Sequence, residues 1–150
     1  MVIYLGADHR GFNLKERIKK ILHEQGYEVF DFGNTSYDEE DDYPDFASAV
    51  AKKISAEPER DRGIVVCGSG AGMEIVANKF KGVRAATAIS ADQIYKARHD
   101  DDINVLSLAA DFTEEEDAGK MVKVFLETPF GGVARHKRRL AKITQIENVG

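Results

Sequence analysis

Short apolar segments that alternate with amphipathic stretches constrain the fold of this chain more than any other feature of its sequence. Five such segments are rich in residues that favour strands, and they cover residues 2–5, 28–32, 63–67, 84–89 and 104–108. Strands that alternate with helical patterns are typical of βαβ units, in which the strands form a parallel sheet. The third and fifth segments are almost continuously apolar, as expected for strands that are covered on both faces.

The stretches between these strands have helical character. Leu14, Ile18 and Leu22 recur at helical spacing, and Gly26 is a plausible C-terminal stop. Later helices are expected over 45–55, over 72–80, after capping boxes at Ser90/Gln93 and Thr113/Glu116, and from about Ala134. We therefore predict one domain over residues 1–150, with a three-layer, Rossmann-like α/β fold. Its five-stranded parallel sheet would be doubly wound, with ligands at the carboxyl ends of the strands.

Composition excludes several classes of protein. The chain has 26 acidic and 21 basic residues and a net charge of −5, which gives no general reason to expect a nucleic-acid partner. We find neither a run of about 20 apolar residues that could span a membrane nor a secretory signal. The single cysteine cannot form an internal disulfide, so a cytoplasmic location is the simplest expectation.

Two strand ends carry side chains suited to chemistry. Asp8 and His9 follow the first strand, although Asp8 could simply cap the next helix. Cys67 ends the third strand, beside backbone amides that would favour its thiolate form. It is therefore a candidate base or nucleophile, and a buried small hydrophobic residue is the alternative.

A glycine-rich loop follows Cys67. Alternating glycines allow a backbone to approach a ligand closely and to direct N–H groups at an anion. The loop consists of Gly68, Ser69, Gly70, Ala71 and Gly72. Its spacing matches neither the dinucleotide fingerprint nor a P-loop. A tight strand-to-helix turn explains the pattern about as well as an anion site does.

Three charged clusters could be functional sites or could simply be solvated surface segments. Arg135 and Arg139 are four residues apart on one helix face and could grip a phosphate, or could form a solvated basic face. The acidic run 38–42 is best explained as a solvated loop. The cluster 98–102 contains one histidine and three carboxylates, whose neighbouring side chains point in different directions. We therefore predict no metal site and no cofactor.

Six segments together resemble the ribose-5-phosphate isomerase B and galactose-6-phosphate isomerase family, in family order along nearly the whole chain. The matching segments are G-A-D-H-R-G-F-x-L-K at the N-terminus, D-Y-P-D-F-A at 42–47, G-I-V-V-C-G-S-G-A-G-M-x-I-x-A-N-K at 63–79, G-V-R-A-A at 82–86, N-V-L at 104–106 and G-G-V-A-R-H-x-R-R at 131–139. The stretch 67–79 is the most specific of these segments.

The resemblance implies a metal-free aldose–ketose isomerisation through an enediolate, most simply of ribose 5-phosphate to ribulose 5-phosphate. By this resemblance Cys67 is the base that moves a proton between C1 and C2. Ser69 and the amides of the loop 68–72 stabilise the enediolate oxygen, and Asp8 orients the sugar and assists ring opening.

The resemblance also implies a phosphate site and a shared assembly. His9, Arg135 and Arg139 would hold the phosphate, and Tyr43 would form a wall of the pocket. Members of the family are similar in being homodimers, sometimes paired further, with a site shared between subunits. The partners implied are therefore a sugar phosphate and a second copy of the chain.

Two segments depart from the family pattern. The family usually has His-Asn four residues before Asn-Val-Leu, where this chain has Asp100 and Asp101, with His99 one residue early. His99 or Asp100 could then serve in ring opening. After the fifth strand the family tends to have an arginine that binds phosphate, and this chain has Asp111, which would repel one.

These departures leave alternatives open. Either His9 and the two arginines hold the phosphate alone, or the substrate is a four-carbon or six-carbon sugar phosphate. A sugar-phosphate-binding protein without catalysis is a rival from another class, disfavoured by the retained Cys67 and Ser69. A nucleotide-binding oxidoreductase is disfavoured by the glycine spacing.

Overall fold

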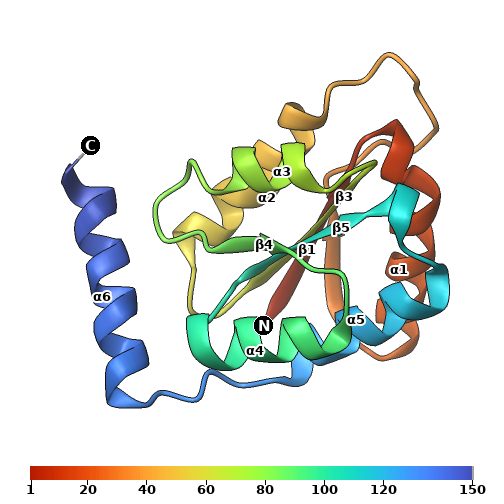
Figure 1. Ribbon diagram of the computed structural model, residues 1–150. Helices are drawn as coiled ribbons and strands as arrows, with labels where there is room; N and C mark the ends of the chain where they lie inside the picture. Colours follow the sequence, from red (N-terminus) through yellow and green to blue (C-terminus); the bar gives the residue numbers. More distant parts are fainter. Residues whose placement is uncertain (150) are drawn as a thin grey trace.

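A five-stranded, fully parallel sheet forms the centre of the computed structural model, which describes residues 1–149 (Figure 1). The strand order is β2-β1-β3-β5-β4. The strands are β1 (Val2–Ala7), β2 (Glu28–Asp31), β3 (Arg62–Cys67), β4 (Ala85–Thr87) and β5 (Val105–Ala109). All five predicted strands are therefore confirmed. β4 is shorter than expected because Ser90 already caps the next helix.

Helices cover both faces of the sheet. They are α1 (Phe12–Glu24), α2 (Tyr43–Ala56), α3 (Ala71–Ala77), α4 (Ala91–Asp101), α5 (Glu115–Glu127) and α6 (Ala134–Val149), with short 3-10 turns η1 (His9–Gly11) and η2 (Ala110–Phe112). α1, α4 and α5 cover one face, α2 and α3 cover the other, and α6 stands apart from the sheet (Figure 1). The predicted three-layer α/β fold is confirmed.

The two hydrophobic cores lie on opposite faces of the sheet, and strand β3 contributes side chains to both. Its side chains alternate, so that Ile64 and Val66 pack with α1, α4 and α5. Val65 and Cys67 point to the opposite face, where α2 and α3 pack. Cys67 therefore ends its strand on the α2/α3 side of the sheet.

Of the two predicted capping boxes, the first is confirmed in part and the second is wrong. Ser90 Oγ accepts a hydrogen bond from the Gln93 amide, as predicted, although the Gln93 side chain accepts from the Ile89 amide instead of that of Ser90. Thr113 does not cap α5, because Glu114 occupies the N-cap position and no side chain bonds there. Acidic residues in the first turn complement the helix dipole instead.

The strand order reverses between β1 and β3, and this reversal locates a crevice. In open α/β sheets, ligands bind outside the carboxyl ends of the strands at such a switch point. Ala7 and Val66 are paired at these ends. A Cβ atom on Gly11 would lie 2.3 Å from the Val66 carbonyl oxygen, so only glycine allows η1 to pack this closely on β3.

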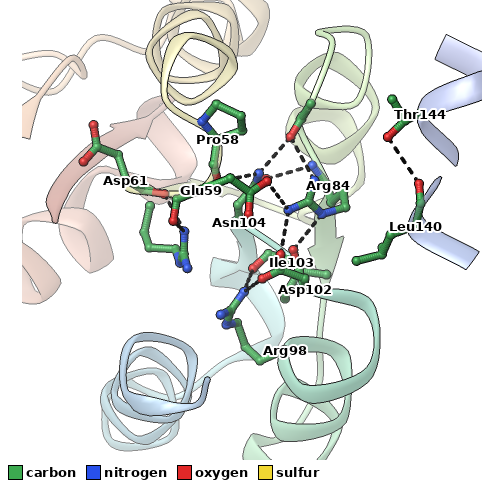
Figure 2. Close-up of polar contacts among 12 residues, drawn as sticks. Pro58, Glu59, Asp61, Arg84, Arg98, Asp102, Ile103, Asn104, Leu140 and Thr144 are labelled. Carbon is green, nitrogen blue, oxygen red and sulfur yellow. Dashed lines mark hydrogen bonds and ion pairs between the residues drawn. The ribbon is translucent and has the colours of Figure 1, made fainter. Parts of the chain in front are cut away.

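The opposite, amino-terminal edge of the sheet is held by a buried polar cluster. The Asn104 side chain accepts from the Arg84 amide at 2.8 Å and donates to the Gly82 and Pro58 carbonyls. Asp102 binds the guanidinium groups of Arg84 and Arg98 (Figure 2). This cluster ties the end of α4 to the beginning of β5.

None of the helices within residues 1–149 combines the length and the apolar character that crossing a bilayer requires.

Candidate active site

A cavity of about 490 Å³ opens at the switch point, where the carboxyl ends of β1, β3 and β5 meet. Its walls come from η1, the start of α2, the loop after β3, and η2. The lining residues are Asp8, Arg10, Tyr43, Cys67, Gly68, Ser69, Gly72, Asp111 and Phe112. Six of these were predicted as site residues from the sequence, whereas Arg10 and Phe112 were not and Asp111 was noted only as a departure.

Cys67 lies at the base of this cavity with 4% of its surface exposed. It is a free thiol. Cys67 therefore packs as a buried small residue, as the alternative interpretation predicted. It also lines the cavity, as a base or nucleophile must. No other thiol exists in the sequence.

The loop after Cys67 needs glycine at two positions because of close contacts. Gly70 has a φ of 78°, and a Cβ atom there would lie 2.9 Å from Thr87 Cγ2. The Gly70 carbonyl accepts hydrogen bonds from Ser107 Oγ at 2.6 Å and from Thr87 Oγ1 at 3.3 Å. At Gly72, a Cβ atom would meet the Tyr43 ring at 2.8 Å. These contacts hold the loop against the sheet on one side and seat Tyr43 on the other.

The hydroxyl of Ser69 lies at the exposed turn of the loop. Ser69 Oγ accepts a hydrogen bond from the Ala71 amide at 3.3 Å. Both residues belong to the predicted site, and Ser69 also lines the cavity. The hydroxyl hydrogen remains able to donate to a ligand oxygen, because a serine hydroxyl both accepts and donates.

Asp8 caps the turn after β1 and also lines the cavity, so both interpretations of the sequence remain open. Its carboxylate accepts from the Gly11 amide at 3.1 Å and so caps η1. It is only 6% exposed, and it lines the same cavity as Cys67. The cap fixes the orientation of a carboxylate that can accept from sugar hydroxyls.

The His9 side chain contacts the loop before α2, and His9 is not among the residues that line the cavity. Its Nδ1 lies 2.8 Å from Asp41 Oδ1, and its backbone amide donates to the same oxygen at 3.0 Å. The hydrogen bond to Asp41 raises the pKa of His9 above its ordinary 6.5. The imidazole therefore keeps its positive charge to a higher pH than a free histidine does.

Asp41 is a residue that sequence reasoning missed. It belongs to the acidic run 38–42, which was predicted to be a solvated loop, and most of that run is exposed. The Asp41 side chain, however, is only 6% exposed and also accepts from Asn34 Nδ2 at 2.9 Å. Nothing in the run itself distinguishes Asp41 from its acidic neighbours, so the sequence held no signal for this role.

Asp111 is paired, which the sequence did not indicate. Its Oδ2 lies 2.8 Å from Nη2 of Arg10 across the cavity mouth. The expected uncompensated carboxylate at this position is therefore not what the structure shows. The opposite charge of Arg10 offsets that of Asp111.

Three predicted site residues lie at the other edge of the sheet. His99, Asp100 and Asp101 end α4, just before β5 begins at Val105. Cys67 pairs with Ala109 at the far end of β5. At about 3.3 Å per residue, the length of β5 alone separates the two positions by roughly 13 Å. A single copy of the chain does not bring these residues to Cys67.

His99 is nevertheless held in a defined arrangement. Its ring stacks on Tyr95, with centroids 5.7 Å apart and planes 18° apart. Its Nδ1 lies 2.7 Å from Asp100 Oδ1, and this hydrogen bond to His99 lowers the pKa of Asp100. A carboxylate bonded to one ring nitrogen sets the orientation of the imidazole.

His136 lies in the basic first turns of α6 but is buried, unlike its charged neighbours. It is 6% exposed and lies edge-on to His99, with its Nδ1 3.8 Å from Asp100. The reason is that α6 begins against the end of α4. His99, Asp100 and His136 bring their ligand atoms within 4.8 Å of one another. They are the one group within residues 1–149 that could hold a metal ion, and the metal-free mechanism stays a prediction.

Arg135 and Arg139 lie on α6, as predicted, and both are exposed. Because α6 stands apart from the sheet (Figure 1), neither belongs to the cavity around Cys67 in the same copy of the chain. Whether they bind phosphate stays a prediction.

Known proteins resemble this chain over nearly its full length. The family model described as Ribose/Galactose Isomerase matches residues 3–143. A protein named probable ribose-5-phosphate isomerase B from Mycoplasma genitalium is 41% identical, over 97% of this chain and 95% of that protein. Ribose-5-phosphate isomerase B from Mycobacterium tuberculosis is 38% identical, over 98% of this chain and 90% of the relative.

Solved structures agree with these relatives. The crystal structure of ribose-5-phosphate isomerase B from Mycoplasma genitalium with bound ribulose 5-phosphate superposes with a TM-score of 0.94 at 40% identity, covering 97% of this chain and 95% of that one. The Clostridium thermocellum ribose-5-phosphate isomerase B gives 0.93 at 41% identity, with coverages of 99% and 98%.

Proposed function

Because this chain belongs to the ribose/galactose isomerase family, we propose that it interconverts ribose 5-phosphate and ribulose 5-phosphate. The observation that carries the proposal is the position of Cys67. The only thiol of the chain lines a cavity at the switch point of the sheet, beside a glycine loop and two polar side chains, Asp8 and Ser69. An aldose–ketose isomerase needs a base and oxygen-binding donors in this arrangement.

The proposed reaction moves two protons within the sugar, one from C2 to C1 and one from the C2 hydroxyl to the C1 oxygen. The Cys67 thiolate removes the proton from C2 of the open-chain aldose, and the C–H electron pair forms the enediolate while the C1 oxygen takes up charge. The Ser69 hydroxyl and the loop amides donate to the oxygens that become negative. The Cys67 thiol then returns the proton to C1, and the proton of the C2 hydroxyl passes to the C1 oxygen as C2 becomes the ketone carbon. No metal or other cofactor is needed for this proton transfer.

Ring opening and phosphate binding are assigned to a site shared between two copies of the chain. Asp8 accepts from the sugar hydroxyls within one copy. His99 or Asp100 from a second copy would open the ring, with Asp101 nearby. His9 of the first copy and Arg135 and Arg139 of the second would hold the phosphate. The proposed active unit is therefore a homodimer, or a dimer of dimers.

The separation of the two residue groups supports a shared site. His99 and Cys67 lie at opposite edges of the sheet, so one copy cannot bring them together. α6 also presents apolar side chains to solvent, with Ile143 42% and Ile146 73% exposed. Exposed apolar residues on a helix that stands apart from the sheet are typical of a surface that a second copy covers.

Substitution of Cys67 tests the proposed base. Cys67→Ala should lower kcat by about 10²–10⁴-fold, the usual contribution of general acid–base catalysis. The dissociation constant for ribose 5-phosphate, measured by calorimetry, should change little. A variant with near-normal kcat would refute the role of Cys67.

Assays of the wild type with four-carbon, five-carbon and six-carbon sugar phosphates test the identity of the substrate. A higher kcat/KM for a sugar phosphate of another length would replace ribose 5-phosphate in the proposal.

A further inference from the structure

One guanidinium group faces the cavity around Cys67. Of the residues that line this cavity within the described chain, Arg10 is the single lysine or arginine, and Asp8 and Asp111 are the two carboxylates. A phosphorylated sugar brings up to two further negative charges to this place. Without a local cation, the two carboxylates would oppose its entry.

The position of Arg10 is set by its neighbours. Arg10 belongs to η1 and Asp111 to η2, and their side chains meet at 2.8 Å. The Asp111 amide also donates to the Gly68 carbonyl at 3.0 Å, which fixes η2 against the glycine loop. The pair lies directly over Gly68. A Cβ atom there would be 2.8 Å from Asp111 Oδ2 and 3.0 Å from Arg10 Nε.

The contact with Asp111 leaves most of the guanidinium free to bind a ligand. A guanidinium has five N–H donors in a fixed fork, and Asp111 approaches one terminal nitrogen. The Arg10 side chain is 59% exposed at the cavity mouth. Its remaining donors can therefore reach a phosphate in a bidentate contact, the geometry for which arginine is suited.

We propose that Arg10 binds the phosphate group of the substrate, and that Asp111 positions Arg10 for this contact. The inference rests on the proposed function for the identity of the substrate. It deepens that function by assigning phosphate selectivity to a residue within the same copy as Cys67. The Arg10–Asp111 pair is then part of the binding site and not a surface ion pair that merely joins two turns.

Substitution of Arg10 should affect substrate binding and not chemistry. Arg10→Ala should raise KM for ribose 5-phosphate by about tenfold to a hundredfold, the effect of losing a hydrogen bond to a charged group, with little change in kcat. Arg17→Ala is the matched control. Arg17 is also exposed and also pairs with a carboxylate, Glu115, but lies outside this cavity. An unchanged KM in Arg10→Ala would overturn the proposal.

A second variant separates binding from a structural role. Asp111→Asn keeps a hydrogen-bond acceptor for Arg10 and removes one negative charge, so phosphate affinity should stay the same or rise. If the pair served only to join η1 and η2, Asp111→Asn and Arg10→Ala would weaken binding equally. That result would refute the proposal.

A binding measurement keeps this test independent of turnover. Calorimetry with inorganic phosphate and with ribose 5-phosphate reports the Arg10 contact even in a chain that does not isomerise ribose 5-phosphate. Arg10-dependent phosphate binding without any isomerisation would refute the proposed function and support the role of Arg10. Normal isomerisation and normal phosphate binding in Arg10→Ala would do the reverse.

Discussion

The buried carboxylate of Asp41 raises the pKa of the neighbouring His9 side chain. It binds both the amide and the ring of His9, and its second oxygen accepts from Asn34. The imidazolium is therefore favoured over the neutral ring, and the pKa of His9 is raised. A group with a raised pKa adds stability that is fully present below its unfolded-state pKa and is lost as the pH rises through its folded-state pKa.

Removing the Asp41 charge should reverse this effect. Asp41→Asn should lower the pKa of His9 toward its ordinary 6.5, because the ring loses its anionic partner. In the proposed site, phosphate affinity would then fall at a lower pH than in the wild type. NMR titration of the His9 ring measures the pKa directly, and the pH dependence of phosphate binding measures the consequence.

Glu39→Gln is the matched control for this experiment. Glu39 lies in the same acidic run and is exposed, so its removal changes the net charge equally. An equal shift of the His9 pKa in both variants would mean that general charge, and not the Asp41 contact, sets that pKa.

At the level of elements, the connection between α4 and β5 determines where His99 and its neighbours lie. Asn104 is fully buried and joins the Pro58, Gly82 and Arg84 backbones at the start of β5. Asp102, which ends α4 in a left-handed conformation, binds Arg84 and Arg98 (Figure 2). Together these contacts fix the end of α4 at the amino-terminal edge of the sheet.

Asn104→Ala should destabilise the fold without touching the cavity. The change leaves buried backbone groups without partners, at a cost of about 3 kcal/mol. For a chain of this size the Tm should fall by roughly 6–12 °C. Asn13→Ala, at an exposed helix position, should change stability by less than about 0.5 kcal/mol. Equal Tm values for Asn104→Ala and the wild type in thermal unfolding would contradict this account of the β5 start.

At the level of the whole molecule, the two groups of proposed site residues face opposite ends of the sheet. Cys67, Asp8 and Ser69 line the cavity at the carboxyl edge. His99 lies at the other edge, beside the start of α6. If the proposed function is correct, a complete site forms only where the cavity around Cys67 of one copy meets the region around His99 of a second copy.

Mixing two inactive variants tests this arrangement. Cys67→Ala and His99→Ala homodimers should each be nearly inactive. Random exchange should give roughly a quarter of wild-type activity, because half the dimers are mixed and each holds one intact site. Activity is measured after co-expression, with two affinity tags to purify the mixed dimer. The wild type paired with the Cys67→Ala/His99→Ala double variant should be inactive, because each shared site of that dimer lacks one of the two residues. An inactive mixed dimer of the two single variants would exclude the shared site.

Local sequence patterns are sufficient to predict the layered α/β fold and the region of the cavity. Strand and helix positions follow from local periodicity, because burial on one or both faces leaves its mark on neighbouring residues. Cys67 and the glycine loop could be predicted for the same reason. They lie at the end of an apolar strand, and in a parallel sheet such ends face the ligand. The family resemblance supplied the chemistry.

The contacts between side chains, in contrast, depend on how the strands and helices pack in three dimensions. The pairs His9–Asp41 and Arg10–Asp111 join residues far apart in the chain, and nothing local distinguishes Asp41 or Asp111 from the other acidic residues of the sequence. The burial of His136 against His99 likewise depends on where α6 begins in space. The separation of His99 from Cys67 follows from the length and direction of β5. Contacts of this kind are set by strand order and helix packing, which a local pattern of residues does not contain.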